Sequence, residues 1–317
     1  MASNNFQSNF NKVMEFNRAF DMVSQEPSVY SCFITDIYDN IKYDPLKNIR
    51  TEIFKDSPSI INLRLALIKE EIGELNDAII QKDIIEQRDA CADILYVVYG
   101  MADVLGISIN DVFNDKIVKN LDIDNYINNN LPSDFISKTQ INDNTNEGSI
   151  SYSNFIKVKR IKNEIIGIEM SSKSHDEIVN YINYNLNKIY LELENNCNLK
   201  NSNETIINKF EIISDNLYNL LKWTYTMTCV LGVNADDDFA IVHNSNMSKL
   251  CDNEDDAKAT IEDYKIKYNA GISPYDSPYY YYLPELDKWI IKNLSTGKAL
   301  KNIKYKKVSF TNPRFVF

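Results

Sequence analysis

Five acidic residues in the first third of the chain have the spacing of a carboxylate cluster. Glu70, Glu71 and Glu74 lie close together in one segment. Asp89 and Asp93 are four residues apart in the next. Residues three or four apart share a face of an α-helix, so each segment would present its carboxylates together. Like charges placed in this way repel and need a cation, protons or water. The spacing therefore makes a metal site one of the interpretations.

Asp93 is the most informative of these residues because its neighbours are apolar. It lies within the sequence DACADILYVV, residues 89–98. Burying an unpaired carboxylate is costly, so Asp93 needs an ion pair or a metal ion. Lys69 and Arg88 are the candidate basic partners for an ion pair. For the three glutamates, a solvated helix face is the alternative interpretation.

The ligand chemistry narrows the choice of metal. Ligation by oxygen alone favours Mg²⁺, with Mn²⁺ as an alternative, over Zn²⁺. Helix carboxylates also bind di-iron centres, but those bundles use a Glu-x-x-His sequence on two helices. Neither His175 nor His243 follows a glutamate by three residues. The di-iron motif is therefore excluded, and His243 is best interpreted as a core or surface histidine.

The pattern of apolar residues predicts a mostly helical chain. Only 8 Gly and 8 Pro occur in 317 residues, which favours long helices over turn-rich sheets. Residues 125–152 are polar and show no apolar period, so we expect a linker between domains 1–124 and 153–317. Apolar residues at three- and four-residue spacing predict the following helices: 7–24, 60–82, 85–105, 153–170, 175–195, 203–231 and 255–268.

Composition argues against several classes of partner. The 45 acidic and 34 basic residues give a net charge of −11, which disfavours binding to nucleic-acid polymers. The 5 cysteines include no C-x-x-C pair and fit reduced thiols. The most apolar stretch, residues 94–107, is too short to span a membrane and contains Asp103. We expect a cytoplasmic protein that binds neither nucleic-acid polymers nor membranes.

An internal repeat relates the two halves of the chain. Residues 89–113 align without a gap on residues 215–239, at an offset of 126. The copies differ in their acidic residues, because Asp93 of the first copy corresponds to Asn219 of the second. The glutamates of the first copy also have no full counterpart upstream of the second. Only the first copy is therefore expected to bind a metal.

At these residues the chain resembles the all-α nucleoside triphosphate pyrophosphatases, the superfamily of MazG, dimeric dUTPase and phosphoribosyl-ATP pyrophosphohydrolase. The E-E-x-x-E motif of that superfamily matches residues 70–74. Its second motif, usually E-x-x-D, matches Asp89-x-x-x-Asp93, with Ala90 at the usual glutamate position. The sequence is more closely similar to MazG-like proteins of phages and large viruses. The matching segments are FNRAF at 16–20, DACADILYVVYG at 89–100 and VHNSNMSK at 242–249.

The resemblance implies an all-α helical bundle in which two tandem MazG-like repeats form a pseudo-dimer. It implies Mg²⁺-dependent hydrolysis of a nucleoside or deoxynucleoside triphosphate to the monophosphate and pyrophosphate. The first repeat would hold the metal ions, and the degenerate second repeat would hold the phosphates. The implied metal ligands are Glu71, Glu74, Asp89 and Asp93, and the catalytic residues are Glu70 and Glu71. The implied substrate-binding residues are Arg64, Tyr96, Asn246, Lys249, Lys298 and Lys301.

Some of these residues also fit a purely structural role. An aromatic residue at helical spacing, such as Tyr96, often belongs to the core, and the lysines near residue 300 also fit a solvated tail. A non-catalytic nucleotide-binding or scaffold protein of the same fold is the alternative function. Ala90 and the missing acids of the second copy support it, whereas the intact set in the first copy favours the enzyme. We expect a monomeric pseudo-dimer or a homo-oligomer, in the host cytoplasm if the source is viral.

Overall fold

The computed structural model describes residues 9–20, 33–35, 41–43, 46, 48–109, 174–197, 206–233 and 235–310. The predicted linker and the predicted helix at 153–170 lie outside these ranges. Most described residues are helical, which confirms the all-α class. The strands in this part of the chain are short and form two antiparallel hairpins. One pairs β1 (Phe33–Thr35) with β2 (Ile41–Tyr43), and the other pairs β3 (Pro278–Leu283) with β4 (Lys288–Asn293).

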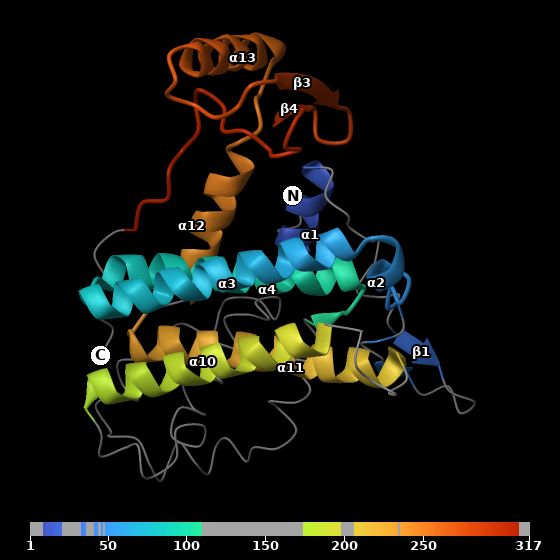
Figure 1. The fold of residues 1–317 in the computed structure, drawn as a ribbon, viewed down its shortest axis with the longest axis vertical. Coiled ribbons are helices and arrows are strands. Elements are labelled where there is room, and N and C mark those ends of the chain that lie inside the picture. Colours follow the sequence, from blue (N-terminus) through green and yellow to red (C-terminus); the bar gives the residue numbers. More distant parts are fainter. Residues whose placement is uncertain are drawn as a thin grey trace, which may run out of the picture. The chain divides into compact units, whose positions relative to one another are not determined.

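Four long helices form the bundle that carries the acidic residues. Helix α3 (Pro58–Gln81) packs on α4 (Ile84–Leu105), and α10 (His175–Cys197) packs on α11 (Ile206–Val230). The two pairs face each other through α4 with α11 and α3 with α10 (Figure 1). All four helices were predicted from the sequence to within a few residues. The short helix α2 (Ile53–Asp56) packs against α3.

The turn between α3 and α4 sets the register of the two acidic segments. Lys82 ends α3 in the left-handed conformation, with φ 56°. The Asp83 carboxylate then caps α4 by accepting hydrogen bonds from the backbone N–H groups of Ile85 and Glu86, at 3.0 and 3.2 Å. Because both helix ends are defined by these contacts, the turn holds the start of α4 beside the end of α3.

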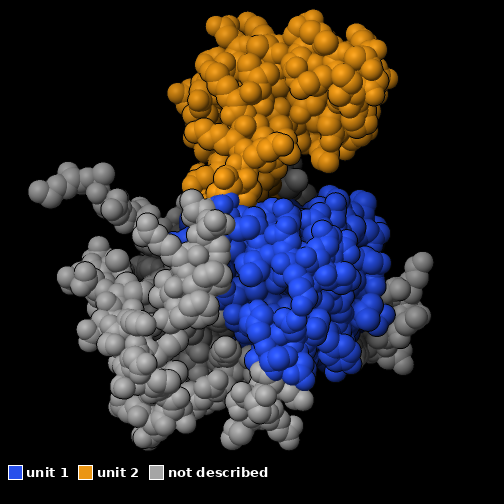
Figure 2. Space-filling model, turned by 90° about the vertical axis from the view of Figure 1, so that its left-hand side faces the viewer, with its two compact units in different colours: residues 1–13, 25–239, 310–317 blue, residues 14–24, 240–309 orange. Residues whose placement is uncertain are grey.

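Contacts divide the chain into two compact units, which Figure 2 shows in different colours. Unit 1 comprises residues 1–13, 25–239 and 310–317, and unit 2 comprises residues 14–24 and 240–309. Helices α1 (Asn9–Ala19) and α12 (Ala235–Met247) each contribute residues to both units. The predicted boundaries at 124 and 153 fall outside the described residues and remain a prediction. The division at residue 240 was not predicted from the sequence.

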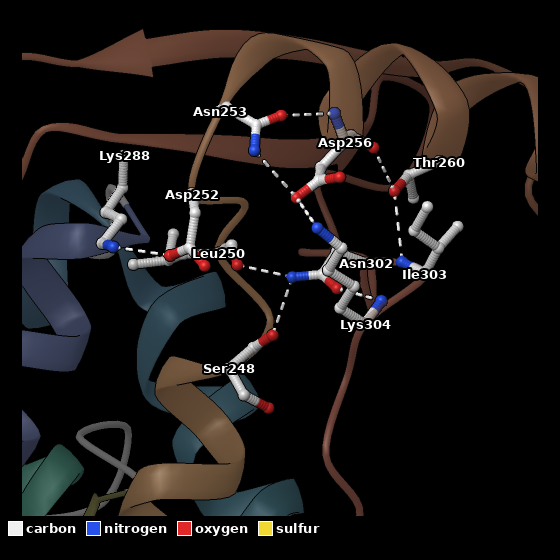
Figure 3. A network of polar contacts seen from close by, with 10 residues as sticks. All are labelled: Ser248, Leu250, Asp252, Asn253, Asp256, Thr260, Lys288, Asn302, Ile303 and Lys304. Carbon is white, nitrogen blue, oxygen red and sulfur yellow. Dashed lines mark hydrogen bonds and ion pairs between the residues drawn. The ribbon is translucent and has the colours of Figure 1, made fainter.

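Unit 2 packs helix α13 (Glu254–Asn269) against the hairpin of β3 and β4. The sequence predicted α13 but neither α12 nor this hairpin. The core of the unit is small and consists of Cys251, Ala257, Ile261, Ile291 and Leu300, with aromatic rings packed around it. Polar contacts supplement this core, as Figure 3 shows. The Asn302 amide donates to the carbonyl oxygens of Ser248 and Leu250, and Lys304 pairs with Asp256 at 2.7 Å.

No helix in the described part of the chain is long and apolar enough to cross a bilayer. Most side chains of helix α4 are buried in the bundle, and those of Ile94, Leu95 and Val98 are fully inaccessible to solvent. It has this position because α3 and α11 both pack on it.

A close approach at Gly100 gives a test of this packing. The buried Arg64 side chain of α3 crosses α4 there, near the charge of the buried Asp103. A Cβ atom on Gly100 would lie 2.7 Å from Nη1 of Arg64. We expect Gly100→Ala to lower the free energy of unfolding by about 1–2 kcal/mol, because overpacking outweighs the gain in helix propensity.

Gly73 is the matched control for this substitution, because it also lies inside a helix but a Cβ atom added to it would meet no heavy atom within 4 Å. Gly73→Ala should therefore raise the free energy of unfolding, by about 0.5–1 kcal/mol. Urea denaturation measures both changes. Equal effects of the two substitutions would show that Arg64 does not pack against Gly100 as described.

Candidate metal and phosphate site

The structure brings together the acidic residues that the sequence singled out. Their proximity is evident from Glu71, whose pKa rises to about 8, chiefly because its carboxyl is partly buried and then because of neighbouring negative charges. In decreasing order of effect, these charges are Asp93, Glu74, Glu70 and Asp89. The carboxylates of α3 and α4 thus form one electrostatic cluster. Within it, Glu70 and Glu74 are exposed, while Glu71, Asp89 and Asp93 are half-buried.

The cluster contains a further carboxylate that the sequence argument missed. Glu86 lies in the first turn of α4, three residues before Asp89 and hence on the same helix face. Burial raises the pKa of Asp89 to about 6, and the charges of Glu86, Glu74 and Asp238 add to that rise. The spacing of three residues was the signal that would have identified Glu86.

The donor atoms of the cluster fit a hard divalent cation. All are carboxylate oxygens, the ligands that Mg²⁺ and Mn²⁺ prefer. Oδ1 of Asp89 is buried and has no hydrogen-bond partner, which is costly for a carboxylate oxygen and would be relieved by a cation. In their present conformations, no three or more Asp, Glu, His or Cys side chains of the described residues converge as a formed metal site. The donor atoms fit the ion in their chemistry. For coordination, the carboxylate side chains would have to rotate until their oxygens face a common point.

Arg88, one of the two candidate partners of Asp93, forms an ion pair with Asp238. Its guanidinium donates two hydrogen bonds to the Asp238 carboxylate, at 2.7 and 2.9 Å. Asp238 lies in the first turn of α12, in the second half of the chain. Lys69, the other candidate, is exposed on α3. No feature of the sequence connected Arg88 with Asp238, because 150 residues separate them.

Two predicted substrate-binding residues lie in the core of unit 1. Arg64 is only 6% exposed and packs beside Gly100, as described above. Tyr96 is also 6% exposed, and its ring stacks on Phe239 with the ring centroids 5.3 Å apart. This is the core position that was the alternative interpretation of Tyr96.

The SNMSK segment, residues 245–249, lies at the end of α12 in unit 2. Its two serines bind the C-terminal segment, since Ser245 Oγ donates to the Lys306 carbonyl at 2.8 Å and Ser248 Oγ accepts from the Lys306 N–H at 3.0 Å. Lys249 donates to the Asn246 side chain at 2.7 Å, and its ammonium lies 5.5 Å from the centroid of the Phe16 ring.

The other predicted phosphate donors belong to the same unit. Lys298 and Lys301 are exposed, with their ammonium groups near the rings of Tyr275 and Tyr305. His243 is 8% exposed, in agreement with a core histidine. Because the acidic cluster belongs to unit 1 and these donors to unit 2, a composite site remains a prediction.

Comparisons with known proteins support the assignment of the acidic region. The model of the phosphoribosyl-ATP pyrophosphohydrolase family matches residues 35–119, which include the whole acidic cluster. An uncharacterized protein of Acanthamoeba polyphaga mimivirus is 31% identical over 263 residues, which is 82% of this chain and 86% of the viral protein. No solved structure matches the chain. The chain belongs to the all-α nucleotide pyrophosphohydrolase superfamily that includes MazG and phosphoribosyl-ATP pyrophosphohydrolase.

The raised pKa of Glu71 predicts a pH-dependent loss of stability in the metal-free protein. The unfolded chain releases this proton near pH 4.5, whereas the folded chain retains it until about pH 8, so stability falls as the pH rises between these values. Glu71→Gln removes the effect. We expect the substitution to raise the free energy of unfolding by on the order of 1–2 kcal/mol at pH 8, after allowance for solvent screening, and to change it little near pH 5.

Urea denaturation at several pH values in a chelator measures this difference. Glu211→Gln, at an exposed position on α11, is the matched control and should show no comparable dependence on pH. If Glu71→Gln changed stability equally at both pH values, the electrostatic description of the cluster would be wrong.

Proposed function

We propose that the protein hydrolyses a nucleoside or deoxynucleoside triphosphate to the monophosphate and pyrophosphate, with Mg²⁺ as cofactor and Mn²⁺ as an alternative. The observation that carries the proposal is the carboxylate cluster on α3 and α4, which lies inside the region matched by the pyrophosphohydrolase family. Glu71, Glu74, Asp89 and Asp93 would hold the metal. A bound divalent cation neutralises charge on the phosphates and lowers the pKa of the attacking water.

The chain's own carboxylates have distinct tasks in this proposal. Glu71 is the most perturbed of them and would release its proton when the cation binds, because the positive charge offsets its acidic neighbours. Asp89 would direct its buried, unbonded oxygen at the cation. Glu70 is exposed at the edge of the cluster, where it would serve as a ligand or orient the water.

We further propose that the two halves descend from the subunits of a dimer. Two-fold symmetry brings equivalent residues together at the axis. Tyr99 and Tyr225 are equivalent at the repeat offset, and their hydroxyl groups lie 3.1 Å apart in the core, 126 residues apart in sequence. The pairing of α4 with α11, the helices that contain these tyrosines, supports the same origin. The protein would then act as a monomeric pseudo-dimer or a higher homo-oligomer. We separately propose that it acts in the cytoplasm and without a nucleic-acid polymer as partner.

Substitutions in the cluster test the proposed activity. We expect Glu74→Gln and Asp93→Asn each to abolish release of pyrophosphate from triphosphates in the presence of Mg²⁺, because each removes a metal ligand while relieving repulsion in the folded state. Thermal unfolding should show that both variants fold, with unchanged or higher stability.

The assay uses a panel of nucleotides and scores pyrophosphate against orthophosphate. Glu211→Gln on α11 serves as the control and should retain wild-type turnover. Wild-type turnover in either cluster variant would refute the metal-site assignment. Nucleotide binding without turnover in the unmodified protein would instead favour the non-catalytic alternative.

The phosphate-binding role of the second half gives a separate test. We propose that Asn246, Lys249, Lys298 and Lys301 donate to the triphosphate. Lys249→Ala should then weaken transition-state binding, through KM or kcat, by about 1.5–3 kcal/mol, as expected for hydrogen bonds to charged groups. Mg²⁺ binding should change little. Lys265→Ala, an exposed lysine on α13, is the control. Unchanged kinetics of Lys249→Ala would refute the composite site and leave the carboxylate assignment standing.

A further inference from the structure

The ion pair of Arg88 and Asp238 is buried at the margin of the acidic cluster. The two side chains are 7% and 3% exposed. Nε of Arg88 donates to Oδ2 of Asp238 at 2.9 Å, and Nη2 donates to Oδ1 at 2.7 Å. This two-bond geometry fixes the orientation of both groups. Buried pairs of this kind are often no more stabilising than apolar side chains of similar volume, so stability alone does not account for the pair.

The pair is close to a proposed metal ligand in sequence and in space. Arg88 directly precedes Asp89 on α4. The negative charge of Asp238 is also one of the causes of the raised pKa of Asp89, after burial and the charges of Glu86 and Glu74. The Arg88 guanidinium also lies 4.8 Å from the centroid of the Phe310 ring. The first turn of α12 thus contacts α4 through Arg88, the residue next to Asp89.

The residues at the repeat-equivalent positions are both uncharged. At the offset of 126, Arg88 corresponds to Ser214 and Asp238 corresponds to Val112, neither of which can form an ion pair. A contact needed only to join the halves would be expected at both equivalent places of a pseudo-two-fold interface. The pair instead occurs on the side that has the carboxylates. The ion pair therefore accompanies the acidic cluster and is not a general feature of the contact between the two halves.

We propose that Arg88 and Asp238 are positioning residues of the metal site. The pair holds the first turns of α4 so that Asp89 presents its buried oxygen to the cation. Helix α12 of the second half thereby sets the metal affinity of a site whose ligands all come from the first half. This inference rests on the proposed function, because it takes a divalent cation as the ligand.

Calorimetric titration with Mg²⁺ in the absence of nucleotide tests the inference. Asp238→Asn keeps the shape of the side chain but removes its charge, and it should weaken Mg²⁺ binding by about 10-fold or more, as loss of a partner that orients a metal ligand typically does. Asp238→Asn leaves the Arg88 guanidinium buried without its anionic partner, which could itself impair folding. A second variant therefore removes both charges. The double variant Arg88→Met with Asp238→Leu removes both charges, so it should fold and show the same weakening.

Tyr225→Phe is the matched control, since it removes other buried polar contacts of the second half, those of the Tyr225 hydroxyl with Tyr99 and Asn9. It should alter the unfolding temperature but leave Mg²⁺ affinity unchanged. Wild-type affinity in the double variant, or equal weakening in Tyr225→Phe, would overturn the positioning role. A wild-type chain that binds no Mg²⁺ would overturn the proposed function and this inference with it. Binding by the wild type and the double variant alike would overturn the inference alone.

Discussion

Partial burial of carboxylates that also repel one another on one helical hairpin is the constraint on which the rest of this structure depends. Folding brings Glu71 and its acidic neighbours together and partly removes them from water, which raises the pKa of Glu71 to about 8. The hairpin tolerates this cost because the opposite faces of α3 and α4 are apolar and buried in the bundle. A cluster that opposes folding in this way is typical of a functional site.

The second half of the chain supports this cluster from the core. Helix α11 packs on α4, and the hydroxyl groups of Tyr99 and Tyr225 are in contact between the two helices. Helix α12 adds Asp238, which pairs with Arg88, and Phe239, whose ring stacks on Tyr96. Asn219 stands 126 residues after Asp93, and the packing of α11 on α4 needs no carboxylate at that position.

The SNMSK segment illustrates how a motif combines structure with chemistry. Ser245 and Ser248 hold the C-terminal segment by hydrogen bonds to Lys306. The Lys249 ammonium donates a hydrogen bond to the Asn246 side chain, and both residues are only partly buried. The serines therefore have a structural task, and the anion-binding task of Asn246 and Lys249 belongs to the proposed function.

The sequence by itself determined the helical class, the bounds of most long helices and the acidic residues of the cluster. These features depend on local spacing: apolar residues recur with the helical period, and carboxylates three or four apart share a face. Even Glu86 was accessible to that reasoning, since it precedes Asp89 by one turn. The tertiary structure alone decided the partner of Arg88, the core positions of Arg64 and Tyr96, and the hairpin of unit 2. Each of these depends on segments far apart in the chain meeting in space, and neither periodicity nor spacing records which distant residue will lie opposite a given side chain.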